Sequence, residues 1–271
     1  MNNLIPSIAS HVDYLSRVIG PRPSGSPGNH AAASYIADQM HRSGLAVETQ
    51  SFPCPAWTCE AAEISVNGER LEILANPYSP SCEVTAPAVP VATLAELETA
   101  ELTGKIALLY GDLSRAPLAC KSWFLKEERD VRIIQVLEEK APAAVLAVQV
   151  QPGSTNRIIE DWEFLIPSAT LTNDSALWLF NRLEVPVHLR LKTQQQPGST
   201  ANVVGRRPGR RAETIVFCAH YDTKIDTPGA GDNAAGVAAL LTLAETTSGM
   251  ALDATLEFVA FTNEEYLPIG D

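Results

Sequence analysis

Residues 214–222 read TIVFCAHYD, and the fold assignment begins from this segment. Its first six residues are almost entirely apolar, which predicts a strand buried on both faces, as in the middle of a parallel sheet. The Gly-rich segment GAGDNAAG at 229–236 leads into a helix predicted over about residues 233–244, and ATLEFVAFT at 254–262 predicts a second strand. A strand, a helix and a strand in this order predict an α/β fold with a mostly parallel sheet.

The residues before position 53 predict two helices and the start of a strand. Apolar residues recur at helical spacing at Ile8, Val12, Leu15 and Ile19, and the helix-breaking sequence GPRPSG follows at 20–25. A second helix is predicted over 29–43, because its apolar residues share one face and Gly44 provides a stop.

The segment from 53 to 195 has a different composition, with short, Pro-rich predicted strands. Asn67-Gly68 predicts the turn of a β-hairpin. Further strands are predicted at 105–110, 143–150, 166–171 and 187–191, a charged helix at about 121–140, and a linker at 194–200. We therefore predict a mostly β insert at 53–195 that interrupts an α/β domain formed by 1–52 and 196–271.

Composition excludes several classes of protein. The net charge is 20 − 32 = −12, which argues against nucleic acid or an anionic membrane as a partner. No apolar run approaches the ~20 residues of a membrane span, and the first residues lack the pattern of a secretory signal. The five cysteines include no C-x-x-C, which favours free thiols and a cytoplasmic location, with a Cys54–Cys59 pair as the alternative.

Polar clusters follow both predicted strands and precede the helix between them. They contain an imidazole with a carboxylate two residues later, one isolated carboxylate and a pair of adjacent carboxylates. In this order the residues are His220, Asp222, Asp232, Glu264 and Glu265. Ligands of open α/β sheets bind beyond the carboxyl ends of the strands, so these side chains are expected to share one crevice. Four carboxylates would repel one another unless a bound cation or raised pKa values relieved them. An imidazole among them favours zinc or another first-row transition metal.

Similar patterns elsewhere in the chain show that spacing alone is weak evidence. His11-Val12-Asp13 repeats the His-x-Asp pattern, but it falls in an amphipathic helix. Of these three residues, only Val12 is expected to face the core. The paired acids at 127–128 and 138–139 lie among basic residues, as on a solvated helix face. Placement after successive strands is what separates the cluster at 220–265 from these controls. A dinucleotide site is disfavoured, because Gly236 comes too late for G-x-G-x-x-G.

The motifs at 220–223, 229–236 and 263–265 together resemble those of the family-28 zinc metallopeptidases, the di-zinc aminopeptidases. GPRPSGSP at 20–27 also resembles the opening of that family, and residues 53–195 resemble a protease-associated domain. The resemblance is strong over 214–265 and only suggestive in the insert. It implies a peptide substrate with a free N-terminus, whose first peptide bond is hydrolysed by water activated by two zinc ions.

The resemblance also implies a role for each residue of the cluster. His220 would ligate one zinc ion, Asp232 would bridge both, and Glu265 would ligate the other. Glu264 would act as general base and acid, and Asp222 would orient His220 through a hydrogen bond. The family often has a cis peptide bond after the bridging Asp, here Asp232-Asn233.

The chain departs from the family pattern in one respect. The family has a further Asp ligand and a further His ligand beyond the Glu-Glu pair, and neither is present before Asp271. We therefore expect a C-terminally truncated peptidase that, expressed alone, binds zinc weakly and is inactive. Two alternatives stay open, namely a non-catalytic, receptor-like relative and a zinc acyltransferase of the glutaminyl-cyclase type.

Overall fold

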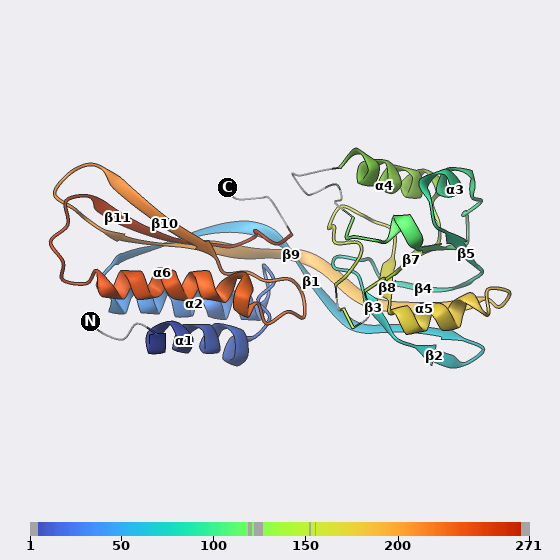
Figure 1. The fold of residues 1–271 in the computed structure, drawn as a ribbon, viewed down its shortest axis with the longest axis horizontal. Coiled ribbons are helices and arrows are strands. Elements are labelled where there is room, and N and C mark those ends of the chain that lie inside the picture. Colours follow the sequence, from blue (N-terminus) through green and yellow to red (C-terminus); the bar gives the residue numbers. More distant parts are fainter. Residues whose placement is uncertain (1–4, 119–120, 122–126, 152, 155, 267–271) are drawn as a thin grey trace. The chain divides into compact units, whose positions relative to one another are not determined.

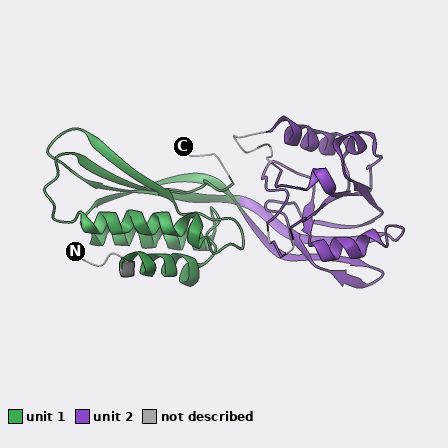
Figure 2. Ribbon diagram, viewed as in Figure 1, with its two compact units in different colours: residues 1–56, 197–271 green, residues 57–196 purple. Residues whose placement is uncertain are grey.

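The computed structural model describes residues 5–118, 121, 127–151, 153–154 and 156–266. It divides into two compact units (Figure 2). Unit 1 consists of residues 1–56 and 197–271, and unit 2 of residues 57–196. These limits differ by a few residues from the sequence-based division, and the kind of domain that unit 2 represents stays a prediction.

The helices predicted before residue 53 are present in unit 1. The first comprises α1 (Ile5–Asp13) and a π-helical turn, η1 (Tyr14–Ile19), and the second is α2 (Pro27–Arg42). The Ser26 side chain caps α2 by accepting a hydrogen bond from the backbone N–H of Asn29, and Pro27 occupies the first helical position, where a missing N–H costs nothing. Gly44 follows the helix with a φ of +77°, the left-handed conformation that favours glycine.

The sheet of unit 1 has the strand order β10-β11-β9-β1. The strands are β1 (Ala46–Val66), β9 (Val187–Arg207), β10 (Thr214–His220) and β11 (Thr255–Phe261), and β1 and β9 continue into unit 2. β10 and β11 are parallel, with α6 (Ala235–Thr246) between them in the chain. Helices α2 and α6 lie side by side against this sheet, with α1 packed on α6 (Figure 1). Ile36, Leu241 and Phe258 belong to the core between these layers.

Two predictions are wrong in this sheet: the burial of the strand at 214–219 and the linker at 194–200. In the part of the chain that the structure describes, β10 pairs with β11 alone and is the edge strand, so Ile215 and Val216 are exposed rather than buried. An apolar sequence favours burial but does not determine what packs on the strand. The predicted linker at 194–200 is part of the continuous strand β9, because pairing with β1 overrides its turn-like composition. A Cβ on Gly198 would lie 2.9 Å from the Cβ of Ala56, so the approach to β1 requires glycine there.

His11 faces the core of unit 1, and the prediction that only Val12 would do so is wrong. His11 is 9 % exposed and Val12 is half-buried. The imidazole is tolerated there because its Nδ1 lies 2.7 Å from the Tyr35 hydroxyl, and because its ring packs edge-on against the Tyr35 ring.

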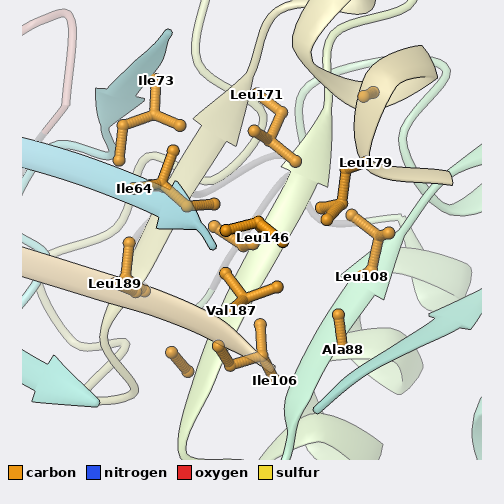
Figure 3. Packing of buried hydrophobic residues seen from close by; sticks show 14 of the residues in the cluster. Ile64, Ile73, Ala88, Ile106, Leu108, Leu146, Leu171, Leu179, Val187 and Leu189 are labelled. Carbon is orange, nitrogen blue, oxygen red and sulfur yellow. The ribbon is translucent and has the colours of Figure 1, made fainter. Parts of the chain in front are cut away.

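Unit 2 contains a second sheet in the order β3-β8-β7-β6-β5, parallel from β5 to β8. Its elements are β2 (Glu69–Leu71), β3 (Ile73–Ala75), β4 (Cys82–Ala86), β5 (Ala88–Val91), α3 (Leu94–Thr99), β6 (Ile106–Leu109), the 3-10 turn η2 (Gly111–Leu113), α4 (Glu128–Lys140), β7 (Ala144–Val148), β8 (Ser168–Leu171) and α5 (Asn173–Phe180). The predicted hairpin is formed by β1 and β2, with Asn67 and Gly68 both at positive φ in its turn. Leu108, Leu146 and Val187 pack together in one of the two cores of unit 2 (Figure 3).

The predicted helix at 121–140 corresponds to α4, and residues 122–126 of that prediction lie outside the described residues. Its paired acids are solvated, as predicted, since Glu138 pairs with Lys121 at 3.0 Å and Glu139 with Arg132 at 3.4 Å on the surface. The structure contains no Cys54–Cys59 disulfide. Both cysteines lie on β1, and five residues of extended strand separate them by about 16 Å, well beyond the reach of a disulfide.

None of the described helices combines the length and the apolar character needed to cross a membrane.

Candidate metal centre

The parallel pairing of β10 and β11 brings two of the predicted clusters together. The two strands end in register, with His220 opposite Phe261. Residues 221–223 and 262–265 therefore leave the sheet at the same end, where the carboxyl ends of both strands lie. The turn Ala230–Ala234, which contains Asp232, immediately precedes α6 and supplies the third cluster. Segments that are far apart in the sequence thus converge at the carboxyl ends of the two strands, where α/β proteins bind ligands.

Three side chains converge closely enough to hold one ion. Ligand atoms of His220, Asp232 and Glu265 all lie within 4.8 Å of one another. Nε2 of His220 is 3.0 Å from Oδ1 of Asp232. Atoms bound at about 2.0–2.2 Å to a shared ion lie at most about 4.4 Å apart, so small side-chain movements would complete such a site. One imidazole nitrogen and two carboxylates are ligands that zinc accepts.

Asp222 lies beneath this cluster, and its side chain is 1 % exposed. Its Oδ1 is 3.5 Å from Nδ1 of His220, and in the described structure neither atom has another hydrogen-bond partner. Its Oδ2 accepts a hydrogen bond from the backbone N–H of Glu265 at 3.1 Å. A proton on Nδ1, shared with Asp222, leaves the lone pair of Nε2 directed at Asp232, which is the tautomer that a metal ligand needs.

Glu264 is placed differently from its neighbour Glu265. Its side chain is 56 % exposed, and its Oε2 lies 3.8 Å from Nε2 of His220. It is therefore at the rim of the cluster, where both solvent and a bound molecule can reach it. The adjacent acids thus have different surroundings, as required if one binds an ion and the other transfers protons.

The pKa values of the cluster reflect an excess of negative charge. Burial by itself would lower the pKa of His220, but Asp222, Glu264 and Asp232 together raise it to about 9. Burial raises the pKa of Glu265 to about 7, with Asp232 and Asp222 adding to the effect. Both groups therefore hold a proton to higher pH than they usually do in the absence of a cation. A divalent ion would relieve the same repulsion, which is the second reason why the residues fit a metal.

The backbone around Asp232 is constrained by two glycines. The Asp232-Asn233 peptide bond is cis, as the family resemblance implies. Gly229 has a φ of +57°, and a Cβ on it would lie 2.2 Å from Cγ2 of Thr223. Gly236 donates its N–H to Oδ1 of Asn233 at 2.9 Å, and a Cβ there would collide with the same side chain. Close approach at these two positions explains two of the three glycines of GAGDNAAG.

Sequence reasoning missed two residues that support the site. The Arg22 guanidinium is fully buried and donates to backbone carbonyls on both sides of the segment that follows β10. Asn29 donates from Nδ2 to the Thr262 hydroxyl at 3.0 Å, immediately before the Asn-Glu-Glu cluster. The motif at 20–27 was visible in the sequence, but its contacts span about 200 residues and no local pattern predicts them. His11, from the other His-x-Asp sequence, is not part of the cluster.

The chain is similar in sequence and in fold to known proteins. Residues 202–270, which contain all five predicted site residues, match the sequence profile of peptidase family M28. The chain is 26 % identical over 268 residues to aminopeptidase YwaD of Bacillus subtilis, covering 96 % of this chain and 55 % of that protein. It is 25 % identical over 235 residues to the lipoprotein aminopeptidase LpqL of Mycobacterium tuberculosis, described as probable, covering 82 % of this chain and 44 % of that one.

Solved structures share the fold of this chain. The zinc aminopeptidase BSAP of Bacillus subtilis superposes with a TM-score of 0.76 at 24 % identity, covering 94 % of this chain and 61 % of that chain. An M28 peptidase precursor from Shewanella amazonensis gives a TM-score of 0.73 at 20 % identity, covering 98 % and 67 %. The chain spans about half the length of the curated relatives that it matches.

Proposed function

We propose that the chain carries the zinc site of an aminopeptidase, an enzyme that removes N-terminal residues from peptides. The observation that carries this proposal is the convergence of His220, Asp232 and Glu265 at one edge of the sheet, with Glu264 beside them. The relatives named as aminopeptidases support the choice of reaction. They are similar along nearly the whole of this chain and not only at the cluster.

Two zinc ions would be held with Asp232 between them, His220 on one and Glu265 on the other. Asp232 suits a bridging position because its carboxylate has two oxygens and is 77 % exposed at the mouth of the cluster. Asp222 would keep the His220 ring in the ligating tautomer through the contact at Nδ1. When bound, zinc supplies Lewis acidity, which polarises the scissile carbonyl and lowers the pKa of water.

The carboxylate of Glu264 would accept a proton from the attacking water and deliver it to the leaving amine. Its exposure allows it to reach both positions, whereas Glu265 is tied to the sheet edge through its backbone N–H to Asp222. The surrounding negative charge would attract the positively charged N-terminus of a peptide. This attraction supports an exopeptidase acting at the N-terminal end over one acting at the carboxylate end.

Unit 2 would be a protease-associated-like domain inserted into the peptidase. Its own parallel sheet and its own buried cores support an independent domain. No residue of unit 2 belongs to the cluster that could hold a metal in the described structure. We therefore assign the chemistry to unit 1 alone. Unit 2 expressed by itself should give a cooperative unfolding transition and bind no zinc at micromolar concentration.

The proposed function is tested by giving the full-length, zinc-loaded protein two kinds of substrate. Hydrolysis of aminoacyl anilides that is lost in the Glu264→Gln variant supports an aminopeptidase. Release of ammonia from N-terminal glutaminyl peptides, without anilide hydrolysis, identifies an acyltransferase of the glutaminyl-cyclase type. Zinc binding with neither reaction identifies a non-catalytic relative. The last two results would overturn the proposal.

A further inference from the structure

Arg22 is the largest fully buried side chain of the described structure and carries a charge that the proposed chemistry does not use. Its guanidinium nitrogens point at carbonyl oxygens and not at acids. Nε donates to Tyr221 at 2.9 Å and Nη2 to Gly229 at 3.1 Å, while Nη1 lies 2.7–2.9 Å from the carbonyls of Leu15, Gly20 and Pro228. No described carboxylate forms an ion pair with it.

These partners belong to two segments that must be held together. Leu15 and Gly20 lie in and just after the N-terminal helical region, whereas Tyr221, Pro228 and Gly229 lie on the segment that joins β10 to Asp232. The Arg22 backbone strengthens the link, since its N–H donates to the Thr223 hydroxyl at 2.8 Å and its carbonyl accepts from the Thr223 N–H at 3.3 Å. The segment 221–229 is thus bound at both its ends by one residue.

The segment 221–229 sets the spacing between two of the proposed zinc ligands. His220 immediately precedes it, and Asp232 follows it by three residues. It has no regular helix or strand of its own. Its geometry therefore depends on contacts from outside, and Arg22 provides five of them. They are the side-chain bonds to Tyr221 and Gly229, the side-chain contact with Pro228, and the two bonds between the Arg22 backbone and Thr223.

Burying a cation costs free energy unless hydrogen bonds or an opposite charge compensate for the lost hydration. The planar guanidinium offers five donors in fixed directions, which suits carbonyls that approach from different sides. Gly229 leaves room for it, because a Cβ at that position would come within 2.9 Å of Nη2. Burial lowers the pKa of Arg22 to about 10, with Asp222 opposing the shift, so the side chain stays charged at neutral pH.

We propose that Arg22 is a positioning residue for the metal centre, which fixes residues 221–229 so that His220 and Asp232 lie at ligand spacing. The proposal rests on the proposed zinc function. It predicts that the loss of the guanidinium weakens zinc binding without removing any ligand.

Arg207 provides a matched control in the same unit. It is also a buried arginine, 8 % exposed, and it donates to the Ala244 carbonyl, the Ser43 carbonyl and the Thr247 hydroxyl. It pairs in register with Leu256 near the start of β11, at the opposite end of that strand from the cluster. Arg22→Met and Arg207→Met each bury an apolar chain of similar length and leave backbone carbonyls without donors. Only the first change touches the segment 221–229.

The first measurement is hydrogen exchange of the metal-free chain, which does not depend on zinc. The backbone N–H groups of Thr223 and Ala234 are hydrogen-bonded, to Arg22 and Gly229 respectively. We expect Arg22→Met to accelerate exchange in peptides covering 221–234, and Arg207→Met to leave these peptides at the wild-type rate. Equal exchange in the two variants would overturn the proposal.

The second measurement is calorimetric titration of the same three proteins with Zn²⁺. Loss of a group that supports metal ligands weakens metal affinity by about 10–100-fold, which is the change expected for Arg22→Met. Arg207→Met should keep the wild-type affinity, even where its free energy of unfolding falls. An Arg22→Met variant that binds zinc as tightly as Arg207→Met would contradict the proposal.

Arg22→Lys keeps the result decisive if Arg22→Met does not fold. The ammonium keeps the charge but cannot reach carbonyls on several sides, so zinc affinity should fall and exchange at 221–234 should accelerate in this variant as well. Wild-type behaviour of Arg22→Lys would show that the guanidinium geometry is not required and would overturn the proposal. If the wild-type chain bound no zinc, the proposed function would fail, while the exchange data would still decide the role of Arg22.

Discussion

Asp222 accepts a hydrogen bond from the backbone N–H of Glu265, with 3.1 Å between Oδ2 and N. The residue that follows the first strand thereby fixes the main chain that follows the second. The other oxygen of the same carboxylate faces the His220 ring at 3.5 Å. One buried acid therefore links the His220 ring to the main chain of Glu265, and so connects two of the three residues that form the candidate metal centre.

Asp222→Asn should weaken zinc binding by about 10–100-fold, because the neutral amide supports the His220 imidazole less well as a ligand. The amide oxygen can still accept from the Glu265 N–H, so the fold should be retained. Titration with Zn²⁺ measures the change, and Asp253→Asn, which alters a surface ion pair with Arg210, is the control. Unchanged affinity in Asp222→Asn would remove Asp222 from the site.

Glu264→Gln and Glu265→Gln should separate catalysis from metal binding. In the full-length protein, Glu264→Gln should retain zinc and lose turnover by about 10²–10⁴-fold, the usual scale for a lost general acid–base group. Glu265→Gln should instead lower the zinc content. Metal analysis and initial rates on an aminoacyl anilide give both quantities. Near-normal turnover of zinc-loaded Glu264→Gln would show that another group transfers the proton.

The two His-x-Asp sequences should respond differently to the same substitution. His220→Ala removes a ligand of the cluster and should abolish binding of at least one zinc ion. His11→Ala should leave the zinc content unchanged, because the buried His11 ring bonds to the Tyr35 hydroxyl and is not part of the cluster. Metal analysis after dialysis compares the variants, and equal loss in both would mean that the site has been misplaced.

His11 should also make stability depend on pH. Burial lowers its pKa below 6.5, with Glu245 opposing the shift, so the unfolded chain binds a proton that the native protein excludes. The contribution of the neutral ring is complete above pH 6.5 and is lost as the pH falls through 6.5 towards the native pKa. Urea unfolding at several pH values should therefore show a steeper acid-side loss in the wild type than in His11→Gln. Parallel curves for the two proteins would contradict this assignment.

Cys54 should react slowly with thiol reagents in the native protein. Burial raises its pKa to about 11, and its side chain is 5 % exposed, so little thiolate is available for attack. Cys218 is exposed on β10. With Ellman's reagent, Cys218→Ser should remove one rapidly reacting thiol, and Cys54→Ser should remove none. A fast phase that disappears in Cys54→Ser would be incompatible with a buried thiol.

The sequence was sufficient to predict the elements that carry the candidate site. Apolar runs at 214–219 and 254–262 are long enough to identify β10 and β11, and the rule that ligands bind at strand ends then joins His220 to Glu265. The exposure of β10 and the continuity of β9 through 194–200 were not predictable, because both depend on which strands pair. The buried Arg22 was missed for the same reason, since its partners lie about 200 residues away.

The most decisive measurement is the location of bound zinc by anomalous scattering at the zinc absorption edge, from crystals of the protein grown with Zn²⁺. The proposal places two anomalous peaks at this cluster: one within coordination distance, about 2.0–2.2 Å, of Nε2 of His220 and a carboxylate oxygen of Asp232, and one at that distance from carboxylate oxygens of Asp232 and Glu265. Zinc density elsewhere in the chain, with this cluster empty, would contradict it.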